Sequence, residues 1–260
     1  MMQVLRGRRA VITGAARGIG EAIARRFAAE GAELVLIDRD GEALHAATAK
    51  IVSSGAKAVA LTADLGDIQS IPRLAADILS SYGGVDIVVS NAGIAGPFAP
   101  LQNLAFDEWR HVQSVNLEGP LVLLQQLAPT LFEATDAAVI MISSIRSLNG
   151  VPVGAPYAAA KAAINSVTKS LACEWGVAGV RVNAILPGPV ETDIIRESIG
   201  DDPAPRQILR DMSPLKRWAV PDDIAGPALF LASGDAKHVT GHLLVVDGGL
   251  TIQSPEHYAV

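Results

Sequence analysis

The chain has 260 residues and a formal net charge of −6 at neutral pH. Its length fits one large α/β domain, and its charge provides no basic field for nucleic acid or an anionic membrane. Half of the residues are apolar, which is enough to bury a sizeable core. The single cysteine, Cys173, excludes an internal disulfide and fits a reducing compartment. We find no targeting segment and no apolar run of the roughly 18 residues that a bilayer requires, and we expect a cytoplasmic protein.

Short, nearly continuous apolar runs alternate with longer segments of helical period along the chain. Seven runs are candidate strands: Ala10–Thr13, Glu33–Ile37, Ala58–Thr62, Ile87–Ser90, Ala138–Ser143, Arg181–Leu186 and Leu243–Val246. The helical segments include Ile19–Ala29, Glu42–Val52, Ile71–Leu79, Val112–Leu131 and Tyr157–Trp175. Apolar runs of this kind are typical of parallel strands that are covered on both faces. The alternation predicts one α/β domain over residues 1–260: a Rossmann-type, doubly wound parallel sheet of about seven strands with helices on both faces.

The stretch from Thr192 to Pro221 breaks this alternation and is rich in proline, aspartate and arginine. A long irregular insert in a compact domain is more often functional than accidental. We therefore expect residues 192–214 to close over a substrate as a lid.

A glycine-rich turn follows the first predicted strand and leads into a helix. It reads Thr13-Gly14-Ala15-Ala16-Arg17-Gly18-Ile19-Gly20. Glycines at such a place permit a tight turn and let backbone N–H groups approach a pyrophosphate at the positive end of the helix. The spacing differs from the common G-x-G-x-x-G form, but its position between strand and helix favours a dinucleotide site.

Asp38 follows the second predicted strand, where a carboxylate can accept hydrogen bonds from the adenosine ribose and repel a 2′-phosphate. Arg17 and Arg39 point the other way, since either could bind a 2′-phosphate. Arg39 lies between two aspartates that partly neutralise it. The balance favours NAD over NADP.

Tyr157 and Lys161 are four residues apart at the start of an alanine-rich helical segment, so both side chains share one face of the helix. A free tyrosine has a pKa of about 10 and is a poor base at neutral pH. A neighbouring cation stabilises the phenolate and lowers that pKa. The pair therefore indicates proton transfer by Tyr157, while an accidental Tyr–Lys pair on an ordinary helix is the alternative.

Ser144 comes just after the strand Ala138–Ser143, at the end of an open sheet where ligands bind. A hydroxyl there can hold a substrate oxygen while Tyr157 moves the proton. On chemistry alone, Ser143 and Ser147 are equally suitable. Arg146 could receive a substrate carboxylate or phosphate, although an exposed loop arginine is the simpler interpretation.

Taken together, these segments resemble the short-chain dehydrogenase/reductase family over nearly the whole chain. The matching pieces are Thr13-Gly14-x-x-x-Gly18-Ile19-Gly20, Asp64-Leu65, Asn91-Ala92-Gly93, Asn116, Ser144, Tyr157-x-x-x-Lys161 and Pro187-Gly188-Pro189-Val190-x-Thr192. The resemblance implies a catalytic tetrad of Asn116, Ser144, Tyr157 and Lys161. In that tetrad Tyr157 is the general acid or base and Ser144 orients the substrate oxygen. Lys161 lowers the pKa of Tyr157 and binds the nicotinamide ribose, and Asn116 holds a water of a proton relay.

The same resemblance implies a set of cofactor contacts along the chain. It assigns to the cofactor Gly14, Arg17, Gly18, Ile19, Gly20, Asp38, Asp64, Leu65, Asn91, Ala92, Gly93, Tyr157, Lys161, Pro187, Val190 and Thr192. It also implies a homotetramer, built on the helices that start near Val112 and Tyr157. No metal is expected, because His238 and His242 lack an acidic partner in a recognised ligand pattern.

The sequence thus predicts an oxidoreductase that transfers a hydride between a nicotinamide cofactor, preferably NAD, and a small secondary alcohol or ketone. One alternative is an NADPH-dependent 3-oxoacyl-carrier-protein reductase, against which Asp38 counts. Another is a catalytically silent scaffold that binds a dinucleotide, since a fold does not fix a function.

Overall fold

The computed structural model describes residues 3–150, 152–193 and 203–253. Its centre is a sheet of seven parallel strands in the order β3-β2-β1-β4-β5-β6-β7. The strands are β1 (Arg9–Thr13), β2 (Glu33–Asp38), β3 (Ala58–Thr62), β4 (Ile87–Ser90), β5 (Ala138–Ile142), β6 (Arg181–Pro187) and β7 (Leu243–Val246). The predicted fold class is confirmed, and every predicted strand is present within one residue of its expected ends.

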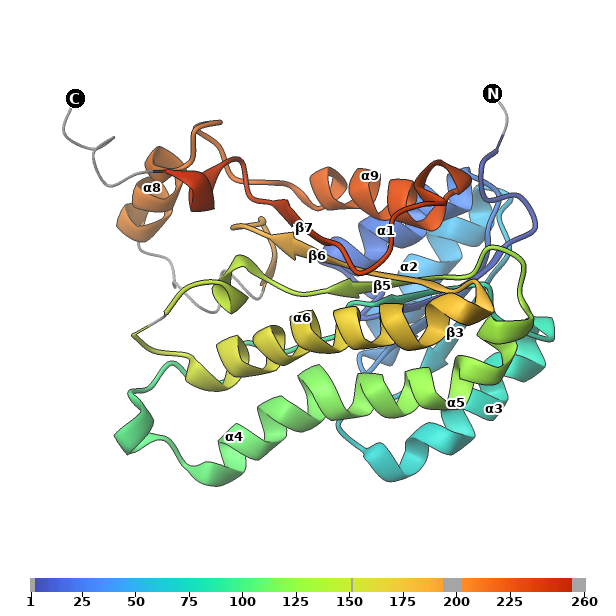
Figure 1. Cartoon of the computed structure of the whole chain (residues 1–260), viewed down its shortest axis with the longest axis horizontal. Helices are drawn as coiled ribbons and strands as arrows, with labels where there is room; N and C mark the ends of the chain where they lie inside the picture. The colour runs from blue at the N-terminus through green and yellow to red at the C-terminus, as the bar shows by residue number, and fades with distance from the viewer. Residues whose placement is uncertain (1–2, 151, 194–202, 254–260) are drawn as a thin grey trace.

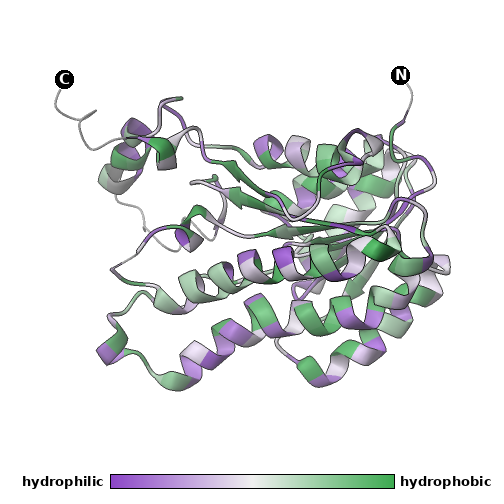
Figure 2. Cartoon of the chain, in the orientation of Figure 1, coloured by the Kyte–Doolittle hydropathy of each residue, from purple (hydrophilic) through white to green (hydrophobic). Residues whose placement is uncertain are grey.

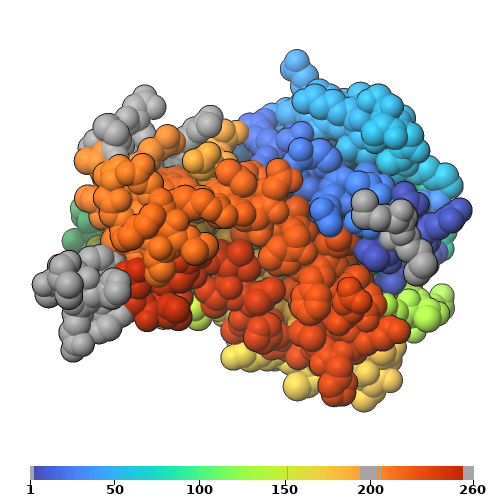
Figure 3. Space-filling view, turned by 90° about the horizontal axis from the view of Figure 1, so that it is seen from above, coloured from blue at the N-terminus to red at the C-terminus, as the bar shows by residue number. Residues whose placement is uncertain are grey.

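Helices cover both faces of this sheet (Figure 1). They are α1 (Gly18–Ala29), α2 (Gly41–Ser53), α3 (Ile71–Tyr82), α4 (Phe106–Gln113), α5 (Gly119–Glu133), α6 (Ala155–Trp175), α8 (Pro203–Met212) and α9 (Pro221–Ala232). Helices α1, α2 and α9 pack on one face, and α3, α5 and α6 pack on the other. In the view from above, the C-terminal segment around α9 lies against the N-terminal segment around α1 (Figure 3).

The two core layers follow from the alternation of side chains along the central strands. In β1, Ile12 points into the layer beneath α1, and its neighbour Val11 points into the layer beneath α3 and α5. Because a strand in the middle of the sheet is covered on both faces, every residue of β4 and β5 is buried. Figure 2 shows the same division, with apolar strands at the centre and helices of mixed hydropathy outside.

Three helical segments differ from the sequence-based expectation. The predicted helix Val112–Leu131 starts earlier, at Phe106, and contains a π-helical turn at Ser114–Glu118 between α4 and α5. The irregular stretch after Thr192 contains α8, which begins at a proline, a residue that the first turn of a helix tolerates. Helix α9 was missed because Pro227 lies inside it, and such a proline argues against a helix in the sequence.

The predicted lid is only partly visible, because residues 194–202 lie outside the described residues, and the lid stays a prediction. None of the described helices is both long and apolar enough to cross a membrane.

The sheet reverses its winding between β1 and β4, and one buried hydroxyl joins the ends of these two strands. Thr13 Oγ1 accepts the backbone N–H groups of Asn91 and Ala92, both at 3.0 Å. Asn91 Nδ2 in turn donates to the carbonyl oxygens of Thr13 and Gly14, at 2.9 and 3.1 Å. Ligands of open α/β sheets bind at such a reversal, beyond the carboxyl ends of the strands.

We predict that Thr13→Val destabilises the protein by about 1–3 kcal/mol, because it leaves two backbone N–H groups without their acceptor. Urea unfolding measures the change in the free energy of unfolding. Thr62→Val, at the exposed end of β3, is the control and should stay within about 0.5 kcal/mol of the wild type. Equal stability of the two variants would contradict this account of the β1–β4 junction.

Candidate active site

The glycine-rich turn lies at the carboxyl end of β1, against the Asn91 turn that follows β4. Gly14 has a φ of +66°, and a Cβ added to it would stand 2.8 Å from Asn91 Nδ2. A Cβ on Gly20 would stand 2.0 Å from the carbonyl oxygen of Gly14, so only glycine lets α1 start this close to the turn. The side chain of Arg17, the residue before α1, makes no capping hydrogen bond to the first turn. The backbone N–H groups in the first turn of α1 therefore receive no hydrogen-bond acceptor from the side chain of the N-cap residue.

Asp38 is fixed at the carboxyl end of β2. Its Oδ2 accepts the N–H of Ala16 at 3.1 Å, and its Oδ1 accepts the N–H of Asp40 at 3.0 Å. The carboxylate is thus held beside the glycine-rich turn, where the sequence analysis placed the adenosine ribose. Arg17 forms an ion pair with Asp40, and its Nη1 lies 3.8 Å from Asp193 Oδ2. The guanidinium that could meet a 2′-phosphate is therefore engaged by carboxylates.

Asp64 and Leu65 follow β3, next to β2 in the sheet. Asp64 is exposed and accepts the N–H of Gly66 at 2.8 Å, whereas Leu65 is buried. A Cβ on Gly119 would stand 1.9 Å from the Leu65 carbonyl oxygen, so the segment after β3 packs directly on the start of α5. The structure brings these two residues to the same edge of the sheet as Asp38.

Asn116 lies in the π-helical turn and is 1% exposed. Its Oδ1 accepts the N–H of Ile94, and its Nδ2 donates to the Ile94 carbonyl oxygen, both at 2.8 Å. The side chain thus holds the loop after β4 in place, close to Gly93 and the Lys161 ammonium. Single-turn π-bulges occur frequently at functional sites. The predicted water-binding role of Asn116 stays a prediction.

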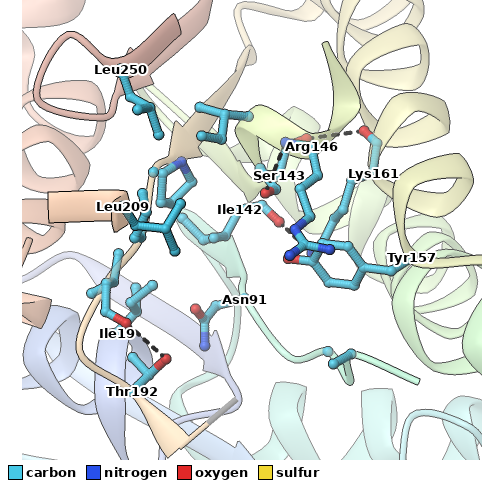
Figure 4. Close-up of a pocket in the computed structure, with 18 of the residues that line it drawn as sticks. Ile19, Asn91, Ile142, Ser143, Arg146, Tyr157, Lys161, Thr192, Leu209 and Leu250 are labelled. Atoms are coloured by element: carbon cyan, nitrogen blue, oxygen red, sulfur yellow. Dashed lines mark hydrogen bonds between the residues drawn. The ribbon is translucent and has the colours of Figure 1, made fainter. Parts of the chain in front are cut away.

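Ser144, Tyr157 and Lys161 line one cavity between the end of β5 and the start of α6. Figure 4 shows Tyr157 and Lys161 on the same side of this cavity. Lys161 Nζ donates to the Ile142 carbonyl oxygen at 2.7 Å and lies 5.6 Å from the centre of the Tyr157 ring. Ser143 Oγ donates to the Lys161 carbonyl oxygen at 3.0 Å. These two bonds join β5 to the first turns of α6 and set the position of Tyr157.

The structure separates the three candidate serines. Ser143 donates its proton to α6, and Ser147 donates to the Ser144 carbonyl oxygen while it accepts from Asn165. Ser144 Oγ accepts the N–H of Arg146 at 3.2 Å, and its hydroxyl faces the Tyr157 phenol instead of the α6 backbone or Asn165. Ser144 also lines the cavity with Tyr157, so it is the serine best placed to meet a substrate oxygen.

Burial dominates the protonation of the two ionisable groups of this pair. Burial raises the pKa of the Tyr157 phenol above its ordinary value, and the Ser144 hydroxyl and the Arg146 charge oppose this rise only in part. Burial lowers the pKa of the Lys161 ammonium to about 8. The sequence analysis expected a lowered pKa for Tyr157. In the protein without a ligand, desolvation raises the pKa of the phenol by more than Ser144 and Arg146 lower it. Bringing that pKa below its ordinary value therefore requires a further positive charge.

The opposite wall of the cavity comes from the start of α1, the segment after β6 and the C-terminal part of the chain. Figure 4 shows Leu209, Leu250, Ile19 and Thr192 across the cavity from Tyr157 and Lys161. Thr192 Oγ1 donates to the Val190 carbonyl oxygen at 3.3 Å. A Cβ on Gly18 would stand 3.3 Å from Thr192 Cγ2, so this segment meets the glycine-rich turn.

The cavity therefore gathers many of the predicted site residues, and the others lie around it. Those that line it are Ile19, Asn91, Gly93, Ser144, Tyr157, Lys161, Pro187, Val190 and Thr192. Ala92 is bonded to Thr13, and Asn116 lies behind Gly93. Gly14, Gly18 and Gly20 form the turn at the end of β1, while Arg17, Asp38, Asp64 and Leu65 extend the arrangement toward β2 and β3.

Further apolar residues line the cavity, among them Phe98, Leu209 and Leu250. Phe98 lies in the loop after β4, near the Asn91 turn, and Leu209 lies in α8, within the predicted lid. Leu250 follows β7, and no motif marked it as part of the site.

Known proteins match this chain over almost its full length. A family model described as "Enoyl-(Acyl carrier protein) reductase" matches residues 14–251. The chain is 37% identical to 3beta-hydroxysteroid dehydrogenase 1 of Eggerthella lenta, with 97% of each chain covered.

Two solved structures with bound cofactors share the fold. A gluconate 5-dehydrogenase from Burkholderia cenocepacia, in complex with NADP and tartrate, has a TM-score of 0.91 at 34% identity, over 97% of this chain and 98% of that one. A 7 alpha-hydroxysteroid dehydrogenase with NADH and 7-oxo glycochenodeoxycholic acid has a TM-score of 0.91 at 34% identity, over 95% and 96%. The chain belongs to the short-chain dehydrogenase/reductase family and is an oxidoreductase that acts on CH–OH groups.

Proposed function

We propose that this protein is an NAD-dependent dehydrogenase of a small secondary alcohol, with Tyr157 as the residue that exchanges a proton with the substrate oxygen. The observation that carries the proposal is the meeting of Ser144, Tyr157 and Lys161 in one cavity at the carboxyl ends of β5 and β6. The glycine-rich turn, the uncapped start of α1 and the Asp38 carboxylate are suited to a dinucleotide on the same edge of the sheet.

In this proposal the chain's own residues transfer the proton, and a bound nicotinamide would accept the hydride. In oxidation Tyr157 would act as the phenolate: as the substrate C–H bond breaks and its electron pair leaves as hydride, the O–H proton would pass to the phenolate oxygen, giving the neutral phenol, while the C=O bond forms. Ser144 donates a hydrogen bond to the substrate oxygen, and Lys161 holds its positive charge beside the phenol. In the reverse direction Tyr157 returns the proton to the carbonyl oxygen.

The remaining family assignments belong to this proposal. Asn116 would support the proton relay from Lys161 to solvent, and Asp64 and Leu65 would contact the adenine. Pro187, Val190 and Thr192 would hold the nicotinamide amide. A homotetramer is proposed on the basis of family resemblance, and residues 192–214 are proposed as the substrate lid.

The preference for NAD is supported by the arrangement around Asp38. Two backbone N–H groups orient its carboxylate, so a 2′-phosphate would meet a fixed negative charge. Arg17 is paired with Asp40 and stands near Asp193. Among related structures, the gluconate 5-dehydrogenase carries NADP and the 7 alpha-hydroxysteroid dehydrogenase carries NADH, so the local charge has to be tested in this chain.

The first prediction concerns the proton-transferring residue. Tyr157→Phe should lower turnover of secondary alcohols by about 10²- to 10⁴-fold, because it removes the general acid–base group, while NADH binding is kept. Absorbance of the reduced nicotinamide measures turnover over a panel of alcohols and ketones, and fluorescence titration measures binding. Tyr82→Phe, on α3 away from the cavity, is the matched control. Cofactor binding without turnover of any panel member by the wild type would favour the silent scaffold.

The second prediction follows from the buried ammonium. A lysine whose pKa falls from 10.5 unfolded to about 8 folded binds fewer protons in the native state between these pH values, so its contribution to stability becomes more favourable as pH rises. Relative to Lys161→Met, the wild-type free energy of unfolding should therefore gain up to about 3 kcal/mol from pH 8 to 10.5. Lys169→Met, exposed on the same helix, should show no such change relative to the wild type. Urea unfolding at several pH values measures both differences, and parallel profiles for all three proteins would refute the burial argument.

The third prediction concerns the choice of cofactor. Asp38→Asn removes the negative charge, and should raise kcat/KM with NADP relative to that with NAD by at least about tenfold. Asp67→Asn, at an exposed carboxylate after β3, should leave the ratio unchanged. A wild type that already prefers NADP would contradict the assignment.

A further inference from the structure

One positively charged side chain in the cavity has no counter-charge among the described residues. Arg146 lines the cavity together with Ser144 and Tyr157. Its guanidinium forms no hydrogen bond and no ion pair with any residue in the described part of the chain. Among the described lining residues, the only other charged side chain is that of Lys161, whose ammonium donates to the Ile142 carbonyl oxygen. None of these lining residues is an aspartate or a glutamate.

The position of Arg146 is fixed from two sides. Its backbone N–H donates to Ser144 Oγ at 3.2 Å, and its guanidinium carbon lies 5.7 Å from the centre of the Phe98 ring. Gly154 lies beside this stack, since a Cβ there would be in ordinary van der Waals contact with both side chains, 3.5 Å from Arg146 Nη1 and 3.7 Å from Phe98 Cε1. Figure 4 shows the guanidinium on the Tyr157 side of the cavity. The arginine is thus held at the reaction site, and its guanidinium donates no hydrogen bond to the residues that the structure describes.

We propose that Arg146 binds a carboxylate of the substrate, and that the protein acts on hydroxy acids and oxo acids with an apolar chain. The inference rests on the proposed function, because it names the substrate class of the same cavity. It adds that the substrate carries a negative charge and that Arg146 recognises this charge.

The number of positive charges that the described lining offers to a ligand favours a carboxylate over a phosphate. A guanidinium presents two parallel N–H groups to a carboxylate and matches its single negative charge. A phosphate monoester carries close to two charges at neutral pH and would need a second free cation. Lys161 is committed to Ile142 and to the neighbourhood of Tyr157.

The rest of the wall indicates what the carboxylate is attached to. Leu209 and Leu250 face the cavity from the side opposite Tyr157 (Figure 4). Phe98, which stacks on the Arg146 guanidinium, and Ile145 add further apolar surface to the described lining. These side chains offer hydrocarbon contacts and few hydrogen-bond partners, so they favour an alkyl chain over a polyhydroxylated one.

The competing explanation is that Arg146 only stacks on Phe98 and supports the loop. A supporting residue would change all substrates alike, whereas a carboxylate-binding residue distinguishes a charged substrate from a neutral one of the same shape. The experiment therefore compares matched pairs: 3-, 4- and 5-oxohexanoate, each with its neutral N-methyl amide.

Reduction of these pairs is measured with NADH and NADPH for the wild type, Arg146→Met and Arg146→Lys. In the wild type, kcat/KM should favour the acids over the amides by about 10- to 100-fold, the range for a hydrogen bond to a charged group. Arg146→Met should lose that preference while the amides change less than about threefold, and Arg146→Lys should keep part of it. Arg110→Met, which removes an arginine from the Phe106 ring outside the cavity, is the control and should behave as the wild type.

Binding is measured separately, by titrating the acids into the enzyme–NADH complex and following cofactor fluorescence. Weaker binding of the acids to Arg146→Met than to the wild type, by about tenfold or more, supports the inference even where turnover is slow. Equal binding to both proteins, no binding of any acid to the wild type, or tighter Arg146-dependent binding of the corresponding oxoalkyl phosphates would overturn the carboxylate assignment.

The two proposals fail in different ways. If neutral ketones are reduced as efficiently as the acids, the substrate class is wrong and the oxidoreductase activity stands. If the acids bind through Arg146 but neither they nor any panel alcohol reacts with either cofactor, the proposed reaction fails and the carboxylate site stands.

Discussion

The buried ammonium of Lys161 is the constraint on which the geometry of the site depends. A charge that is only 4% exposed is costly to desolvate, and the protein offsets this cost with a hydrogen bond to the Ile142 carbonyl oxygen. That bond requires the end of β5 to lie directly beneath the first turns of α6. The Ser143 hydroxyl adds a second link from β5 to the backbone of the same helix. Tyr157, one turn before Lys161, therefore has its place relative to Ser144 set by the need to satisfy a buried charge.

The reversal of the sheet between β1 and β4 sets the other half of the site. Thr13 and Asn91 join the ends of these strands with side-chain hydrogen bonds rather than with a backbone ladder. Because the junction uses side chains, the two turns that follow can diverge and leave space above the sheet. The glycine-rich turn continues toward Asp38, and the Asn91 turn continues toward Asn116 and Lys161. One junction thus separates the proposed adenosine side from the proposed reaction side.

Much of this arrangement could be predicted from the sequence, because it depends on regular spacing. The strands were visible as apolar runs, and the Tyr157–Lys161 pair was visible because residues four apart share a helix face. The choice among Ser143, Ser144 and Ser147 was not predictable from chemistry alone, since it depends on which hydroxyl α6 and Asn165 engage. The π-helical turn around Asn116 was also hidden, because one extra residue in a helical turn leaves no clear mark on an apolar pattern. Arg146 looked like a loop residue, and its inward position became visible only with the stack on Phe98 beside Gly154.

The charge of the whole molecule and the charge of the cavity have opposite signs, and this contrast bears on how an anion would be selected. A net charge of −6 gives no long-range attraction for a carboxylate. At physiological ionic strength, however, the field of exposed charges is screened over roughly 8 Å, whereas Arg146 meets a ligand at contact distance inside a largely apolar wall. Short-range pairing of this kind acts mainly on the dissociation rate, and steering acts mainly on the association rate. The arrangement therefore suits discrimination between charged and neutral substrates after they have entered the cavity, and not rapid capture of anions from solution.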